Sequence, residues 1–255
     1  LDFSDMPAIC ETYERVTRMH VYERTPYAGS LVFAAFSGSH QDAIAKGMTW
    51  RKERGQHRWD CPYIPIDPHD IGRTYDADVI RINSQSGKGG IGFLLQQNYG
   101  YNPPPKMREA LGYKVKEVSD HEHRELSVKE VLAVFEKNYL NHTHPLNVPD
   151  AHFIQNSDGS ITANIVITGG GSTVKCSATG NGRLDAVATA LEKQTGMHFT
   201  LVHYSEHALD SDTDSRACSY VGLKWASGEE TWGCGTHTDI IVAGIRALVS
   251  AINNR

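Results

Sequence analysis

The hydrophobic pattern of the first 140 residues is mainly helical. Ser4 or Asp5 can cap a helix that runs to about residue 20, since Pro7 falls in its first turn, where no N–H is needed. Further helices are predicted for residues 40–54, 89–98, 106–118 and 128–140. Residues 79–83 resemble a short strand or a helix end, and the prolines of residues 62–68 predict a stiff loop.

The pattern becomes strand-like after the polar, proline-containing stretch 142–149, which we interpret as a domain boundary. Two predicted strands, at residues 151–155 and 160–168, flank Asp158-Gly159, which is a strong hairpin signal. A third strand at residues 172–179 leads into a helix. The apolar face of that helix has the i, i+3, i+4, i+7 spacing and consists of Leu184, Val187, Ala188 and Leu191.

The same order of elements then repeats. Strands are predicted for residues 199–204, 217–225 and 231–235, with Ser227-Gly228 as a turn. The closing helix buries Ile241, Ile245, Leu248, Val249 and Ile252. Each repeat carries a Gly-x-Gly sequence just before its helix, Gly180-Asn181-Gly182 in the first and Gly233-Cys234-Gly235 in the second.

These patterns together predict an α+β protein. Helical linker subdomains are expected over residues 1–145, and a domain of two βββα units over residues 146–255. Strand edges and faces left open by six strands favour a second chain, so we expect a homodimer.

Composition narrows the classes of function. A net charge of −5 and a pI of about 6.2 argue against a polyanionic partner, so nucleic acid is not expected. The longest apolar stretch, residues 31–36, is far shorter than the ~20 residues needed to cross a bilayer. Five scattered cysteines suggest reduced thiols rather than a disulfide framework or a zinc ribbon. We expect a cytoplasmic protein, and its opening at Leu1 without Met suggests a preceding segment.

Two glycine-rich sequences invite a phosphate-binding interpretation. Ser86-Gly87-Lys88-Gly89-Gly90 fails the Walker pattern, because Ile82 stands where Gly is needed and Gly89 where Ser or Thr is needed. Gly180-Asn181-Gly182 lacks the third glycine of a dinucleotide site, where Asp185 stands. The second sequence is better explained as a strand-to-helix turn, whose exposed amides could still hold a carboxylate.

Several histidines are candidates for metal binding or catalysis. The pairs His121/His123 and His142/His144 have no fixed third ligand, so solvated side chains are favoured over a metal site. His40 lies in a polar cluster at a helix start, where the helix dipole favours the neutral imidazole that a general base requires. Tyr63, held between prolines, could supply a rigid hydroxyl, but spacing alone leaves a structural role equally open for both residues.

Three blocks in order resemble the α-isopropylmalate synthase family of the longer, actinobacterial and fungal type. They are Phe36-Ser37-Gly38-Ser39-His40-Gln41-Asp42-Ala43-Ile44, Pro62-Tyr63-Ile64-Pro65-Ile66-Asp67-Pro68 and Arg81-Ile82-Asn83-Ser84-Gln85-Ser86-Gly87-Lys88-Gly89-Gly90. The two-unit tail, with Tyr204-Ser205-Glu206-His207-Ala208, is similar to the leucine-sensing dimer domain of that family.

The resemblance implies a transferase that condenses acetyl-CoA with 2-oxoisovalerate (3-methyl-2-oxobutanoate). The products are 2-isopropylmalate and CoA, in the first committed step of leucine biosynthesis, and leucine inhibits the enzyme. A divalent metal ion (Zn, Mg or Mn) is implied in a preceding (β/α)8 barrel, whose Asp and His-x-His ligands have no counterpart here. This chain alone is therefore expected to be inactive and to hold no cofactor.

The same resemblance implies roles for particular residues. His40 is matched to a general base or proton relay and Tyr63 to its hydroxyl partner, in a lid that reaches over the partner subunit's active site. The positions matched to leucine binding are Asn181, Gly182, Leu184, Leu201, Tyr204, Ala208 and Ile240. Helix-start amides would hold the carboxylate, and Leu184, Leu201 and Ile240 would line an apolar pocket.

Two alternatives remain open at this point. The chain could be a non-catalytic amino-acid-binding regulatory module, although such a sensor would have no need of the His40 and Tyr63 blocks. It could also be part of a related citramalate or homocitrate synthase, because a pocket trimmed by one methyl discriminates by only ~1–3 kcal/mol.

Overall fold

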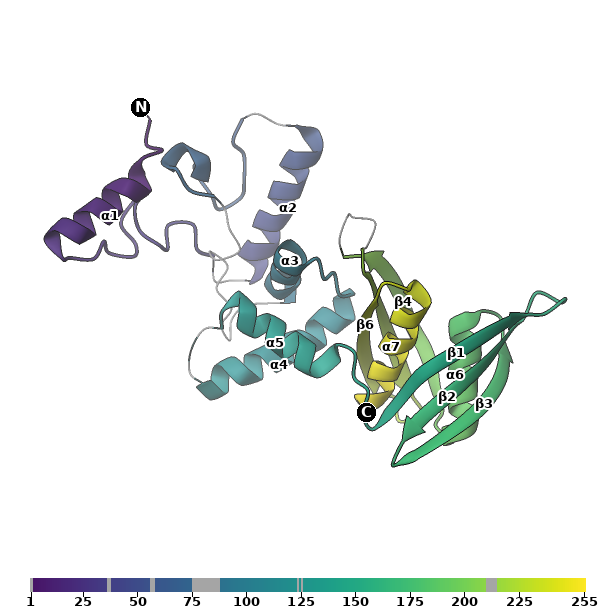
Figure 1. Cartoon of the computed structure of the whole chain (residues 1–255). Coiled ribbons are helices and arrows are strands. Elements are labelled where there is room, and N and C mark those ends of the chain that lie inside the picture. The colour runs from purple at the N-terminus through teal and green to yellow at the C-terminus, as the bar shows by residue number, and fades with distance from the viewer. Residues whose placement is uncertain are drawn as a thin grey trace. The chain divides into compact units, whose positions relative to one another are not determined.

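The computed structural model describes residues 2–35, 38–55, 58–74, 88–122, 124, 126–209 and 215–255. The chain forms two compact units, residues 1–132 and 133–255 (Figure 1). The first is helical and the second contains all the strands of the described residues, which confirms the predicted α+β class. The predicted domain boundary at residues 145/146 stays a prediction.

The helices of the first unit follow the predicted order. They are α1 (Met6–Thr17), α2 (Gly38–Arg54), the 3-10 turn η1 (Pro68–Ile71), α3 (Lys88–Tyr99), α4 (Pro105–Glu122) and the first turn of α5 (Val128–Tyr139). The expected side-chain cap of α1 is wrong, because Asp5 occupies the N-cap position without a side-chain hydrogen bond. The predicted element at residues 79–83 lies outside the described residues.

Apolar spacing explains how these helices pack. On α4 the buried residues Met107, Leu111 and Val115 recur every fourth position, and α4 packs on α3, where Leu94 and Leu95 are fully buried. A separate core lies under α2 and the proline-containing loop that follows it. It consists of Phe33, Ala35, Ile44, Cys61, Ile64 and Ile71.

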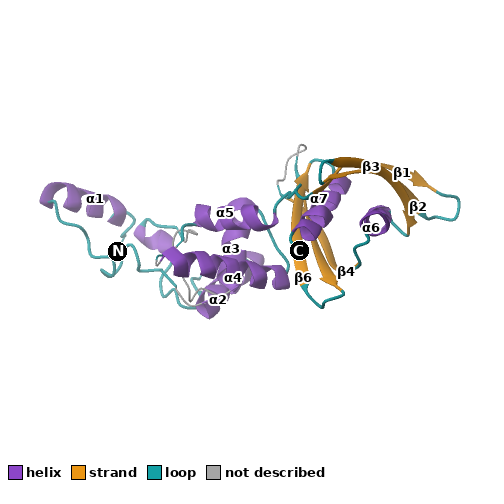
Figure 2. Cartoon of the chain, turned by 90° about the horizontal axis from the view of Figure 1, so that it is seen from below, coloured by secondary structure: helices purple, strands orange, loops and turns teal. Residues whose placement is uncertain are grey.

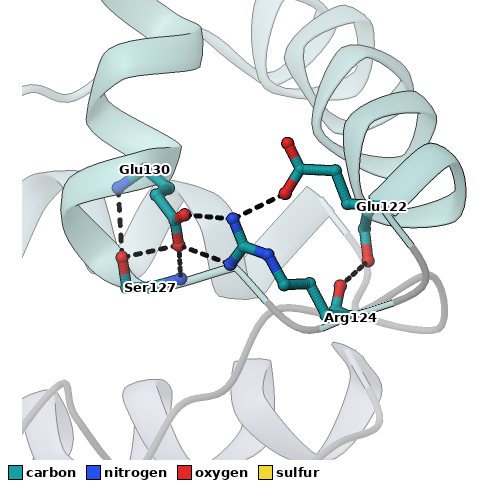
Figure 3. Close-up of polar contacts among 5 residues, drawn as sticks. Glu122, Arg124, Ser127 and Glu130 are labelled. Carbon is teal, nitrogen blue, oxygen red and sulfur yellow. Dashed lines mark hydrogen bonds and ion pairs between the residues drawn. The ribbon is translucent and has the colours of Figure 1, made fainter.

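The start of α5 is stabilised by a reciprocal side-chain cap (Figure 3). The Ser127 hydroxyl accepts a hydrogen bond from the Glu130 N–H at 3.3 Å, while a Glu130 carboxylate oxygen accepts one from the Ser127 N–H at 2.8 Å. This Ser-x-x-Glu arrangement satisfies two amides that the helix itself leaves unpaired. Arg124 donates hydrogen bonds to both oxygens of the same carboxylate.

This cap should make stability depend on pH. The hydrogen bond from Arg124, followed by those from Ser127, lowers the pKa of Glu130 from 4.5 to about 2. Because the folded-state pKa is the lower one, the stabilisation is fully present above pH 4.5 and is lost as the pH falls towards 2. Glu130 is exposed, so we expect less than about 1 kcal/mol. Acid titration of the unfolding free energy should flatten over this window in Glu130→Gln but not in Glu136→Gln; equal curves for the two variants would contradict the assignment.

The second unit consists of two antiparallel three-stranded sheets, each covered by one helix (Figure 2). Strands β1 (Leu146–Gln155), β2 (Ile161–Gly169) and β3 (Ser172–Gly180) pair in that order and are followed by α6 (Arg183–Thr195). Strands β4 (Phe199–Ala208), β5 (Ala217–Trp225) and β6 (Glu230–His237) repeat the plan and are followed by α7 (Ile240–Asn253). The predicted pair of βββα units is confirmed.

The two units of this repeat share one hydrophobic core. Ala163 and Ile165 of β2, Val221 and Leu223 of β5, and Leu248 of α7 belong to the same buried cluster. On α6 the fully buried side chains are Ala186, Val187, Ala190 and Leu191, whereas Leu184 and Ala188 are only partly buried. The predicted apolar face is therefore correct in its centre and too wide at its edge, which leaves Leu184 partly exposed.

The second Gly-x-Gly sequence does not precede a helix. Gly233 and Gly235 lie inside β6, and Asp239 is the N-cap of α7. A Cβ atom at Gly233 would stand 2.2 Å from the Ala247 carbonyl oxygen, and one at Gly235 would stand 2.1 Å from that of Ala243. These glycines thus let α7 approach the sheet closely, whereas only the first Gly-x-Gly forms the predicted strand-to-helix turn.

The stretch before β1 is held by the end of α7. The His142 N–H donates to Ser250 Oγ at 2.7 Å, and a His142 ring nitrogen lies 2.9 Å from Asn254 Oδ1. Asn253 accepts from the Leu146 N–H and donates to the carbonyl oxygens of His142 and Leu146. The expectation that His142 is solvated is therefore wrong, because tertiary hydrogen bonds fix it. None of the described helices has the length and apolar character needed to cross a membrane.

Candidate functional site

His40 and Tyr63 are brought together in the first unit. Their rings stack with centroids 4.1 Å apart and planes inclined by 28°. His40 lies in the first turn of α2, and Tyr63 lies in the loop that follows this helix. The two residues that the resemblance singled out, 23 positions apart in the sequence, are thus direct neighbours.

A tight turn fixes Tyr63. The Ile64 N–H donates to the Cys61 carbonyl oxygen at 3.3 Å, and the Trp59 indole N–H donates to the Ile64 carbonyl oxygen at 2.7 Å. Pro62 precedes Tyr63, whose φ of +63° lies in the left-handed region that normally favours glycine. A bulky residue held in this region carries backbone strain, which is often found where a side chain must be aimed at a functional site.

A glycine on α2 sets the position of this turn. A Cβ atom at Gly47 would stand 2.5 Å from Cδ of Pro62, so only glycine allows the turn to lie this close to the helix. Gly47 is seven residues after His40 and therefore lies on the same helix face. Docking of Pro62 against Gly47 explains why the next residue, Tyr63, reaches the His40 ring.

The pair lies at the surface of its unit. Tyr63 is 63% exposed, and His40 is exposed as well. Proton abstraction by imidazole becomes effective in a site from which water is excluded, so this pair needs a further surface to cover it. No group of three metal-ligating side chains occurs among the described residues, so the metal implied by the resemblance has no binding site within that part of the chain.

The predicted carboxylate site lies at the start of α6. Gly182 is the N-cap residue and provides no side-chain hydrogen bond to the first turn. The Asn181 N–H donates to Asp185 Oδ2 at 2.8 Å, which closes the turn and leaves the Asn181 side chain exposed. First-turn amides without a side-chain cap favour an anionic ligand.

A bulge in β4 places two predicted residues on one face of the sheet. Leu201 and Tyr204 are three positions apart, and in a regular strand they would point to opposite faces. The register shifts between Leu201 and His203, so that Leu201 pairs with Leu223 and Tyr204 with Val221. Ala208 follows Tyr204 at even spacing and lies on the same face.

Gly244 of α7 is the point where the two βββα units meet this face. A Cβ atom built on Gly244 would lie 3.2 Å from Tyr204 Oη and 3.8 Å from Leu184 Cδ1. Ile240, one helical turn earlier, lies on the same side of α7. Leu184, Tyr204 and Ile240 thus border one area, although they come from three different elements.

This area is an open patch rather than a closed pocket. Leu201, Tyr204 and Ile240 are 39%, 40% and 42% exposed, respectively. A separate cleft of about 700 Å³ lies between β1 and α7 and is lined by Asp150, Phe153, Arg183 and Asp239, among others. Neither it nor a second hollow on the β1–β3 sheet is lined by the predicted effector residues.

Sequence reasoning missed three residues of the patch: Glu206, Ser219 and Gly244. The Tyr204 hydroxyl donates to the Glu206 carboxylate. Burial, and then the neighbouring Glu206, raise the pKa of Tyr204 to about 12, so its hydroxyl remains protonated at neutral pH. Strand alternation could have identified Glu206, two residues after Tyr204, but Ser219 and Gly244 join the patch only through tertiary packing.

Comparison with known proteins bears on both sites. Residues 30–96 match the family described as alpha-isopropylmalate synthase, post-catalytic domain-like, and residues 125–255 match the LeuA allosteric (dimerisation) domain. The chain is 50% identical to the 2-isopropylmalate synthase of Desulfitobacterium hafniense over 253 residues, which are 99% of this chain and 45% of the relative. The corresponding enzyme of Helicobacter hepaticus is 48% identical, over 99% of this chain and 46% of the relative.

The chain therefore spans less than half the length of these curated relatives. The two matched regions follow one another in the chain and include the residues of both candidate sites. Since the second region alone covers more than half of the chain, the chain belongs to the α-isopropylmalate synthase family, with the LeuA allosteric (dimerisation) domain as its second half.

Proposed function

We propose that the chain supplies the lid and the leucine sensor of a 2-isopropylmalate synthase. The carrying observation is the meeting of Leu184 and Tyr204 at Gly244 within the region that matches the LeuA allosteric domain. Relatives named 2-isopropylmalate synthase support this activity. In the complete enzyme, an acyltransferase of the cytoplasm, acetyl-CoA and 2-oxoisovalerate condense to 2-isopropylmalate, and CoA is released by hydrolysis of the thioester.

In this proposal residues 1–145 act on the reaction and residues 146–255 regulate it. His40 removes or relays the α-proton of the acetyl thioester, and the stacked Tyr63 orients the imidazole and offers its hydroxyl. Both side chains are exposed, which suits a lid that closes over an active site of the partner subunit in a homodimer. We assign no step to a metal, because the described residues offer no ligand set for one.

The effector would bind across the patch of the second unit. The amides at the start of α6 receive its carboxylate, beside Asn181 and Gly182. The apolar side chains of Leu184, Leu201 and Ile240 contact its branched chain, with Tyr204 and Ala208 on the same sheet face. A second subunit could close the open side of the patch, in keeping with the dimerisation role in the name of the matched family.

Calorimetric titration of the chain with leucine tests this proposal. We expect leucine to bind more tightly than isoleucine or lysine, and Asn181→Ala to weaken leucine at least tenfold, because the Asn181 side chain borders the carboxylate site. Asn164→Ala, an exposed asparagine on β2, is the matched control and should leave the affinity unchanged.

The other outcomes are equally informative. Absence of leucine binding, or equal weakening by both variants, would contradict the assigned sensor. Tighter binding of isoleucine would favour a citramalate-type enzyme. Leucine binding by a complete enzyme without any change in its turnover would favour a regulatory module that acts on another protein.

A further inference from the structure

Glu206 is the acidic group of the effector patch. It lies two residues after Tyr204 on β4, so both side chains point to the same face, and its backbone pairs with Ser219 of β5. The Tyr204 hydroxyl donates to the Glu206 carboxylate, which orients the acid beside the area where Leu184 and Gly244 meet. No ion pair involving Glu206 is formed within the described parts of the chain. A carboxylate is thus placed next to an apolar surface without a cation.

Ser219 adds an independent observation. Its side chain is completely buried, yet its hydroxyl oxygen has no hydrogen-bond partner among the described residues. Such an unpaired buried hydroxyl is costly and therefore rare in native structures. Ser219 faces Glu206 across the β4–β5 pair, and its hydroxyl is near enough to that of Tyr204 to lower the pKa of the tyrosine. The site thus offers a carboxylate, a phenol and a free hydroxyl.

This combination fits an ammonium group. An ammonium has three N–H donors and no acceptor, and it is matched by three oxygens of which at least one is charged. A carboxylate or keto group would instead meet the negative charge of Glu206. The opposite requirement holds at the start of α6, where free amides favour an anion. The two ends of the patch therefore carry complementary requirements.

We propose that Glu206, together with Ser219 and Tyr204, binds the ammonium group of the effector, so that the site accepts α-amino acids and rejects the corresponding carboxylic and 2-oxo acids. This inference rests on the proposed effector site and adds its selection of ligand class. Such selection matters physically, because leucine and the acids that share its carbon skeleton present the same branched chain to Leu184, Leu201 and Ile240. Apolar contacts alone cannot separate them.

A cycle of ligand and protein changes tests the inference. The chain and its Glu206→Gln variant are titrated with leucine and with 4-methylpentanoate, which is leucine without its amino group. For the unmodified chain we expect 4-methylpentanoate to bind at least 30-fold more weakly than leucine. In Glu206→Gln, leucine should weaken at least tenfold, whereas the binding of 4-methylpentanoate should stay within about twofold or improve. Glu229→Gln, at the β5–β6 turn, is the matched control and should change neither ligand.

Ser219→Ala provides a second test that does not depend on Glu206. Removal of the unpaired hydroxyl should leave the ligand-free chain as stable or more stable in urea unfolding, and should weaken leucine while sparing 4-methylpentanoate. Equal loss of both ligands in Glu206→Gln would overturn the inference, because it would show that Glu206 only supports Tyr204. Unchanged leucine binding in that variant would overturn it as well. If the unmodified chain bound no leucine, the proposed effector site itself would fail.

Discussion

Alanine at Gly233 should destabilise the second unit by about 3 kcal/mol. The added Cβ would stand 2.2 Å from the Ala247 carbonyl oxygen and 2.3 Å from the Ala251 nitrogen. Both atoms belong to the backbone of α7, so no change of side-chain rotamer can relieve the contact. The helix must move away from β6, which loosens the core that Leu248 and Val249 form with Val221 and Leu223. Urea unfolding followed by circular dichroism measures the loss.

Gly182→Ala is the matched control for this variant. No atom lies within 4 Å of the site that its Cβ would occupy, and its φ of −156° is open to any residue. Its cost should stay below about 1 kcal/mol, since only a poorer N-cap residue is introduced. If Gly233→Ala were as stable as Gly182→Ala, the close approach of α7 to β6 would be incorrect.

His40→Ala in a complete 2-isopropylmalate synthase containing this chain should lower kcat by a factor of about 10²–10⁴. General-base groups typically contribute this much, and the proposed role of His40 is proton removal from the acetyl thioester. The KM for 2-oxoisovalerate should change little, because His40 does not bind the keto acid in this proposal. Steady-state rates measured across pH distinguish a base from a structural residue, since the limb due to imidazole titration should disappear. His152→Ala, an exposed histidine on β1, is the control.

Tyr63 allows the stacking and hydroxyl roles to be separated. Tyr63→Phe keeps the ring against His40 and removes the hydroxyl, so an effect on kcat reports the hydroxyl alone. Tyr63→Gly relieves a left-handed backbone conformation of +63° and should stabilise the unit or leave its stability unchanged, while activity falls. Full activity in both Tyr63 variants and in His40→Ala would contradict a catalytic pair.

Element identity was largely accessible from the sequence because local signals and tertiary packing agree. The helix predicted at residues 40–54 forms as Gly38–Arg54, and that at 128–140 forms as Val128–Tyr139. The hairpin at Asp158-Gly159 forms between β1 and β2, with Gly159 at a φ of +86°. Strong periodicity and turn chemistry predict such elements without knowledge of their partners.

The errors arose where a local pattern had two structural explanations. Gly233-Cys234-Gly235 looks like the turn before a helix, yet it is the part of β6 on which α7 rests. Both arrangements require glycine, and the choice between them depends on how closely a helix that starts five residues later approaches the strand. His142 has an equally polar local sequence, but its contacts come from Ser250 and Asn254, more than 100 residues away.

The sequence by itself determined the elements, their order in two βββα units and the family, because helical periodicity, turn residues and block motifs are local properties. The tertiary structure decided which side chains share a site. The β4 bulge turns Leu201 to the face of Tyr204, Gly244 admits Tyr204 beside Leu184, and Gly47 admits Pro62 beside the helix of His40. It also left the hydroxyl of Ser219 without a partner beside Glu206. These contacts depend on distances between backbone segments that are remote in sequence, which no local pattern encodes.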